Sequence, residues 1–168
     1  MRKIAILAAT LLALPALADH ARSLRARLIG YQEVPAVSTA AEGDFQARVS
    51  QDGNSVEYTL AYTRLSSAVV QAHIHFAQSG VNGPIIVWLC GTTGTPGPAG
   101  TPTCPQDGNV SGTFTAANVL ASPAAQQLAA GELAEFVAAM QAGVAYANVH
   151  TATSPGGEIR GQIWRWHR

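Results

Sequence analysis

Histidines are the residues of this sequence whose type and spacing most favour a chemical role. His73 and His75 stand two positions apart in a segment with strand-like alternation, which places both imidazoles on one face. His150 occurs in a second such segment and supplies a third nitrogen if the two segments lie side by side. Because imidazole suits copper and zinc, these three histidines form a candidate metal site. The alternative, which the sequence leaves open, is that they are hydrogen-bonded structural residues.

Motifs that commonly carry catalysis are missing from the sequence. It contains no G-x-S-x-G nucleophile elbow, no H-E-x-x-H, no P-loop and no dinucleotide-binding glycine pattern. Its acidic residues are scattered, so no carboxylate pair for glycoside hydrolysis is indicated. We therefore expect a non-enzymatic binding or structural module, or else a histidine-based copper or zinc protein.

Three polar residues late in the chain are candidates for supporting the histidines. Asn148 precedes His150 on the same late strand. Glu158 and Arg160 share a face, on the last predicted strand, and are expected to pair with each other or with neighbouring strands. An ion pair is favoured over catalysis, and at a surface it contributes only ~0–1 kcal/mol.

The first 18 residues have the composition of a secretion signal. Arg2 and Lys3 precede an apolar run at 4–14, and a small-x-small cleavage site ends at Ala18. We expect cleavage there, leaving one domain at 19–168 in the periplasm or outside the cell. An uncleaved membrane anchor is the alternative, but the run is shorter than the ~20 residues that span a bilayer. No later segment is apolar enough to span one.

The charge of the mature chain limits its partners. Removal of residues 1–18 takes two of the ten basic residues and none of the ten acidic ones. The mature chain therefore has eight basic and ten acidic residues. It also takes Lys3, which is the only lysine and would be needed for a Schiff base. A lysine-free chain that is slightly acidic is not expected to bind nucleic acid. The expected partner is a protein or a small ligand.

Cys90 and Cys104 are expected to form a disulfide, because an even pair in an exported chain is typical of one. Closing this loop stabilises the fold by ~3 kcal/mol in the chain-entropy model. A redox or metal-binding pair is the alternative, but the C-x-x-C spacing is missing. The Gly- and Pro-rich residues 91–102 between them are expected to form a surface loop.

Period-2 alternation and turn signals predict a chain made mainly of strands. Residues 22–27 are expected to form a basic stub before the first strand. A single helix is expected at 132–142, where apolar residues recur at helical spacing. The pattern indicates an all-β fold, an immunoglobulin-like Greek-key antiparallel β-sandwich with one helical insertion. The strands are expected at 45–49, 56–63, 70–76, 85–89, 110–115, 144–150 and 158–166.

Three stretches of the sequence resemble the CHRD (chordin-type) domain family. They are Gln-Glu-Val-Pro at 32–35, Ala-His-Ile-His at 72–75 with Gly-Val-Asn-Gly-Pro at 80–84, and Tyr-Ala-Asn-Val-His-Thr at 146–151 with Pro-Gly-Gly-Glu-Ile-Arg-Gly-Gln at 155–162. The resemblance extends from about Leu28 to Trp164 and implies an immunoglobulin-like or barrel-like β fold. Chordin antagonises bone morphogenetic proteins, but this chain has one domain copy and none of chordin's cysteine-rich modules. Growth-factor antagonism is therefore not expected.

A shorter likeness concerns the H-x-H pair alone. Copper/zinc superoxide dismutases are β-sandwiches whose copper site uses an H-x-H strand, and His73 and His75 are similar to that strand. The further metal ligands of those enzymes have no counterpart in this sequence. The likeness implies a metal-binding alternative but not dismutation.

Overall fold

The computed structural model describes residues 22–106 and 108–166. The secretion signal expected at 1–18, with its cleavage site, lies outside the described residues. Within the described part of the chain, no helix is long and apolar enough to cross a membrane.

The described residues form eight strands in one antiparallel sheet, whose order is β5-β4-β7-β8-β1-β2-β3-β6. The strands of this sheet are β1 (Ser23–Ile29), β2 (Glu42–Val49), β3 (Ser55–Thr63), β4 (Val69–Phe76), β5 (Ile85–Gly91), β6 (Gly108–Thr115), β7 (Ala145–Thr151) and β8 (Ile159–Arg165).

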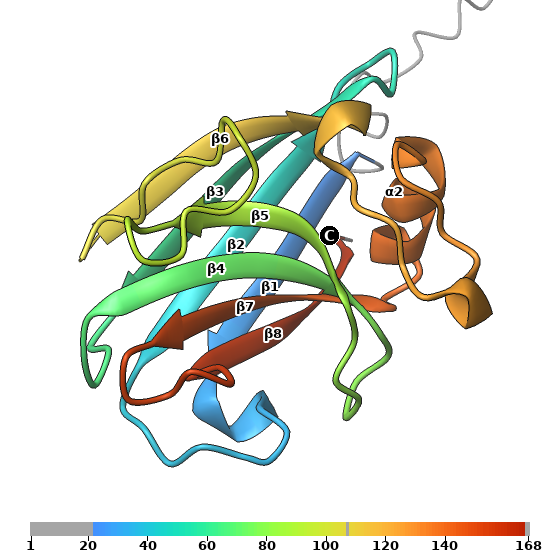
Figure 1. The fold of residues 1–168 in the computed structure, drawn as a ribbon. Helices are drawn as coiled ribbons and strands as arrows, with labels where there is room; N and C mark the ends of the chain where they lie inside the picture. The colour runs from blue at the N-terminus through green and yellow to red at the C-terminus, as the bar shows by residue number, and fades with distance from the viewer. Residues whose placement is uncertain (1–21, 107, 167–168) are drawn as a thin grey trace, which may run out of the picture.

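The sheet curls until its two ends, β5 and β6, lie beside each other (Figure 1). Leu120, which follows β6, donates its N–H to the Ile86 carbonyl of β5 at 2.9 Å. Across the interior, the Tyr58 hydroxyl of β3 donates to the Leu89 carbonyl of β5 at 2.6 Å. The expected all-β antiparallel fold is confirmed as one nearly closed sheet. The immunoglobulin-like sandwich and its Greek-key connections stay predictions.

β1 corrects the expectation of a basic stub at 22–27. Its residues Leu24, Ala26 and Leu28 are buried, while Arg25 and Arg27 face outward. β1 pairs with β2 on one side and with β8 on the other, so it lies in the middle of the sheet. β1 alternates buried and exposed residues as the correctly predicted strands do, but its exposed positions are arginines, which made the segment look like a basic stub.

One α-helix occurs in the described chain, α2 (Leu133–Gln141), as expected from the apolar spacing. Its buried face carries Leu133, Phe136, Val137 and Met140, and it packs beside β7 and β8 (Figure 1). Three short 3-10 helices, η1 (Gly30–Gln32), η2 (Ala116–Asn118) and η3 (Ala124–Gln126), lie in the connections.

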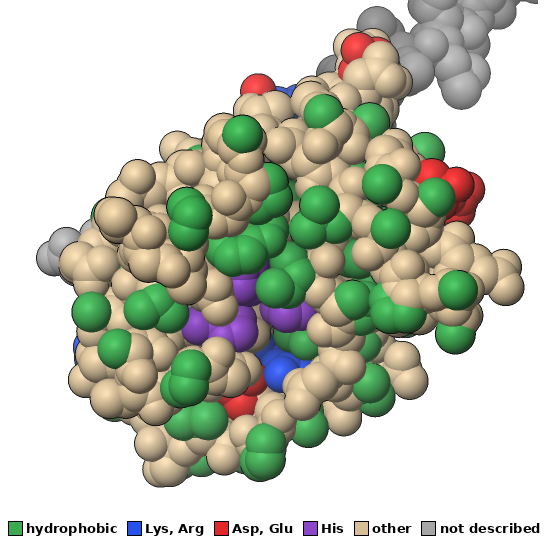
Figure 2. All heavy atoms as spheres, in the orientation of Figure 1, with side chains coloured by type: hydrophobic (Ala, Val, Ile, Leu, Met, Phe, Trp, Pro, Cys, Tyr) green, Lys and Arg blue, Asp and Glu red, His purple; other side chains and the backbone are tan. Residues whose placement is uncertain are grey.

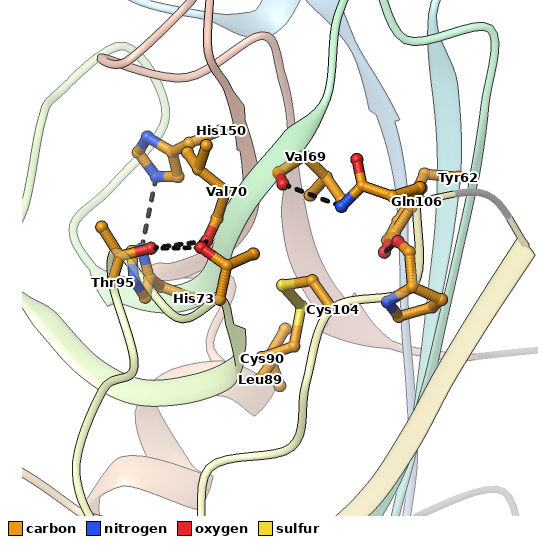
Figure 3. Close-up of a disulfide and its surroundings, with 12 residues drawn as sticks. Tyr62, Val69, Val70, His73, Leu89, Cys90, Thr95, Cys104, Gln106 and His150 are labelled. Carbon is orange, nitrogen blue, oxygen red and sulfur yellow. Dashed lines mark hydrogen bonds between the residues drawn. A yellow bond between two sulfur atoms is a disulfide. The ribbon is translucent and has the colours of Figure 1, made fainter.

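Cys90 and Cys104 form the expected disulfide, which closes the loop at 91–102 (Figure 3). The loop is also fixed to β4, because the hydroxyls of Thr92 and Thr95 both donate to the Val70 carbonyl. This attachment lies three residues before His73, so the disulfide loop helps to hold the segment that carries the histidines.

Candidate metal centre

The three histidines lie on the outward side of the sheet, on a surface formed by β4, β7 and β8. In an antiparallel pair, directly opposed residues point to the same side of the sheet. His73 opposes Asn148, His75 opposes Tyr146, and Asn148 in turn opposes Arg160. Gln71 opposes His150, so that histidine points the same way. We call this surface the polar face: His73, His75, Tyr146, Asn148, His150, Glu158 and Arg160.

Loops cover the polar face and remove it from water. His73 is fully buried, and His75 and His150 keep only 7% and 6% of their surface exposed. The covering segments come from 30–41, 77–84 and 152–157, each of which hydrogen-bonds to side chains of the face. Figure 2 shows histidine side chains at the floor of a hollow, beside basic and acidic groups. The centre is therefore a nearly closed site with a small opening.

The three rings converge. One nitrogen from each of His73, His75 and His150 lies within 4.8 Å of the others. His73 Nδ1 and His150 Nε2 are 3.3 Å apart, and Figure 3 shows the two rings pointing toward each other. Two nitrogens bound tetrahedrally to one metal at ~2.0–2.1 Å stand ~3.3–3.4 Å apart. The observed separation matches this spacing, and in the metal-free protein it is also that of a hydrogen bond from His73 Nδ1–H to His150 Nε2.

Backbone carbonyls fix the orientation of two rings. His75 Nδ1 lies 2.9 Å from the Gly83 carbonyl, and His150 Nδ1 lies 2.9 Å from the Pro155 carbonyl. A carbonyl only accepts, so each Nδ1 carries the hydrogen and each Nε2 presents a lone pair. Metal-bound histidines are commonly held in this way through the nitrogen that does not ligate.

Two ring nitrogens of the site have no hydrogen-bond partner among the described residues. They are His73 Nε2 and His75 Nε2, and both are buried. An unsatisfied buried polar atom costs ~1–3 kcal/mol, so each needs a physical reason. For His75 Nε2, which bears a lone pair, a metal ligand role supplies that reason. The ring of His73 stands edge-on to Trp88, with centroids 4.2 Å apart.

Burial keeps the histidines neutral. It lowers the pKa of His73 to about 2, and the charges of His150 and His75 contribute further. It also lowers the pKa of His75 to about 4, and that of His150 falls for the same reason. Because imidazole must be neutral to bind a metal, the site is in its ligating form at neutral pH.

Arg160 and Glu158 do not pair with each other in the described structure. Arg160 Nε bonds Glu33 Oε2 at 3.0 Å, and both side chains are buried. Asn148 donates to the other oxygen of Glu33 and to the Ile159 carbonyl. Arg160 was expected to pair with Glu158 or with a neighbouring strand. It pairs instead with Glu33, because the covering loop at 30–41 brings that residue onto the face.

Glu158 instead holds two loops against the end of β7. It is fully buried and accepts hydrogen bonds from the hydroxyls of Thr39, Ser66 and Thr151 and from the Ser66 N–H. Burial alone would raise the pKa of Glu158, but these hydrogen bonds outweigh it and the pKa is lowered. Its role is to close the end of the polar face.

Glu33, Tyr146 and Trp88 are residues of the site that sequence reasoning missed. Tyr146 stacks on His75 with ring centroids 4.7 Å apart, and the Arg160 guanidinium lies 4.2 Å from the Tyr146 ring centre. Tyr146 precedes Asn148 by two positions on β7, so its place on this face follows from the period of the strand. Glu33 lies in the Gln-Glu-Val-Pro stretch, but its proximity depends on the fold of a loop.

The comparisons with known proteins identify a family. The family model described as the CHRD domain matches residues 24–163, a span that contains the whole polar face. This agrees with the resemblance seen in the sequence from about Leu28 to Trp164. Neither the curated proteins nor the solved structures gave a match.

Proposed function

Because the chain belongs to the CHRD domain family, we propose that it is an exported, non-enzymatic binding module that holds a copper or zinc ion with His73, His75 and His150. We refer to these three residues as the histidine triad. The observation that carries the proposal is the convergence of three buried imidazoles whose nitrogens lie within 4.8 Å of one another.

The triad fits such an ion in number, type and arrangement of ligands. His75 and His150 would ligate through Nε2, and His73 through Nδ1, which lies 3.3 Å from His150 Nε2. Three imidazoles leave one tetrahedral position for water, a small ligand or a partner's side chain, as in open zinc sites. Figure 2 shows histidine side chains at the floor of a surface hollow, beside which such a ligand would bind.

The supporting residues position the triad rather than react. Asn148 and Arg160 fix Glu33, and the Arg160 guanidinium lies against Tyr146, which packs on His75. Glu158 holds the loops around the face. Both buried carboxylates are occupied by hydrogen bonds, so neither is available as a general base beside the triad. This supports binding over catalysis.

Export is part of the proposal. The Cys90–Cys104 disulfide is typical of a protein that works in the periplasm or outside the cell. We also retain the immunoglobulin-like sandwich, similar to that of copper/zinc superoxide dismutases, as the finer description of the curled sheet.

Calorimetric titration of the metal-free chain 19–168 with zinc and with copper(II) tests the proposal. We expect one ion per chain, and we expect the His73→Ala/His75→Ala variant to lose this binding. Gln71→Ala is the matched control, because Gln71 lies on β4 and on the same side of the sheet but outside the triad. Equal binding by wild type and the double variant would contradict the proposal, as would copper held only through Asp19 and His20.

A further inference from the structure

We infer that the histidine triad selects copper(I) over copper(II) and zinc(II). The inference rests on the proposed metal function and adds the charge state of the ion that the site holds. It follows from three features of the polar face: the charge of the ligands, the charge beside them and the spacing of their nitrogens.

The ligand set carries no negative charge. The group of metal-ligating side chains found in the described chain consists of three histidines and includes no aspartate, glutamate or cysteine. The groups that hold His75 and His150 are the backbone carbonyls of Gly83 and Pro155, which are also uncharged. Desolvation cost rises with the square of the charge, so a divalent ion costs ~4-fold more to bury than a monovalent one. Without an anionic ligand from the protein, less of that difference is compensated.

A positively charged side chain is separated from the triad by one aromatic ring. The Arg160 guanidinium lies 4.2 Å from the ring centre of Tyr146, and the Tyr146 ring stacks on His75 with centroids 4.7 Å apart. Glu33 does not offset this by ligating, because Asn148 binds one of its oxygens and Arg160 binds the other. Glu33 is thus engaged away from the triad, and a second positive charge on the ion is poorly solvated.

The spacing of the nitrogens also disfavours copper(II). Adjacent ligands of a square-planar ion at ~2.0–2.1 Å stand ~2.8–3.0 Å apart, whereas tetrahedral and trigonal ligands stand ~3.3–3.6 Å apart. His73 Nδ1 and His150 Nε2 are separated by 3.3 Å. Copper(II) prefers the tetragonal arrangement, whose shorter nitrogen spacing this pair does not have.

The test compares the three ions on the chain 19–168. Copper(I) affinity is measured without oxygen by competition with a coloured copper(I) chelator. Copper(II) and zinc affinities are measured by competition with a chelator suited to each ion. We expect a lower Kd for copper(I) than for either divalent ion. The His73→Ala/His75→Ala variant should lose copper(I) binding while its circular dichroism remains that of a folded chain.

A charge variant tests the reason for the selectivity. Asn82 accepts a hydrogen bond from Arg160 at 2.6 Å, so Asn82→Asp adds a negative charge beside Arg160 with little change in size. We expect it to raise zinc affinity relative to copper(I) affinity by about 10-fold. Asn54→Asp, in the exposed turn between β2 and β3, is the matched control and should leave the ratio unchanged.

The outcomes separate this inference from the proposed function. If copper(II) or zinc binds more tightly than copper(I), and the double histidine variant loses that binding, the selectivity is wrong and the metal function stands. If Asn82→Asp leaves the affinity ratio unchanged, the electrostatic reason is wrong. If no metal binds, or the double variant binds as wild type does, the proposed function fails and this inference fails with it.

Discussion

Acid should destabilise the metal-free protein well above the pH at which its carboxylates titrate. The triad is buried and neutral, and burial lowers the pKa of His73 to about 2 and of His75 to about 4. In the unfolded chain both histidines titrate near ~6.5. The unfolded state therefore binds more protons than the folded state, so this stabilisation is complete above ~6.5 and is lost as the pH falls toward the folded values.

The size of the effect follows from these pKa values. At pH 5 an unfolded histidine is almost fully protonated, while His73 and His75 in the folded protein are still mainly neutral. Each contributes a loss of ~2 kcal/mol between pH 7.5 and 5, or ~4 kcal/mol together. His150 adds to the loss, because burial lowers its pKa too. Glu33 opposes it, because burial raises the pKa of that carboxyl and its protonation favours the folded state.

Urea unfolding of the metal-free chain 19–168 at pH 7.5, 6.5, 5.5 and 5.0 measures this loss. The His73→Gln/His75→Gln variant removes both titrating groups and keeps polar side chains in place, so its free energy of unfolding should vary much less with pH. Gln71→Ala, which leaves the triad intact, should keep the slope of the wild type. A wild-type free energy of unfolding that is constant from pH 7.5 to 5.0 would refute the reasoning, as would equal slopes in wild type and the glutamine variant.

Three further substitutions have expected outcomes. Gly157→Ala should destabilise the fold by ~2–3 kcal/mol in thermal unfolding, because its φ is +122° and the new Cβ would lie 2.7 Å from side-chain atoms of Asn148 and Glu33. Gly156→Ala is the control and should be near neutral, because no atom lies within 4 Å of its new Cβ. Glu158→Gln should cost ~2–4 kcal/mol in urea unfolding at pH 7, since it replaces a carboxylate that accepts four hydrogen bonds; an unchanged midpoint would contradict its structural role. Replacing Cys90 and Cys104 with serine should cost ~3 kcal/mol in urea unfolding, and no loss would mean that the loop is held by its other contacts.

Much of the fold follows from local pattern. The strands after β1, α2 and the disulfide all appear where period-2 alternation, helical spacing and an even cysteine pair predicted them. β1 was missed because Arg25 and Arg27 dominate its composition, although Leu24, Ala26 and Leu28 keep the alternation. The closing of one sheet into a curled shape depends on pairing between distant strands, which no local pattern encodes.

The convergence of His73, His75 and His150 could be predicted from the sequence, but the burial of these residues and several of their neighbours could not. The alternation of His73 and His75 with Ala72 and Ile74 is that of a strand with one face in water. In the structure both faces are buried, because loops fold back over the outward side. Likewise the partner of Arg160, Glu33, is 127 residues away along the chain. Loop conformation decides both features, and loops lack the periodicity on which sequence reasoning relies.

Anomalous diffraction from a crystal of the chain 19–168 grown with copper tests the central claim most directly. We predict one strong copper peak among the triad, ~2.0–2.1 Å from His73 Nδ1, His75 Nε2 and His150 Nε2. The carbonyls of Gly83 and Pro155 should still bind the opposite nitrogens of His75 and His150. A crystal whose copper lies only elsewhere on the chain, with no peak among the three rings, would contradict the account.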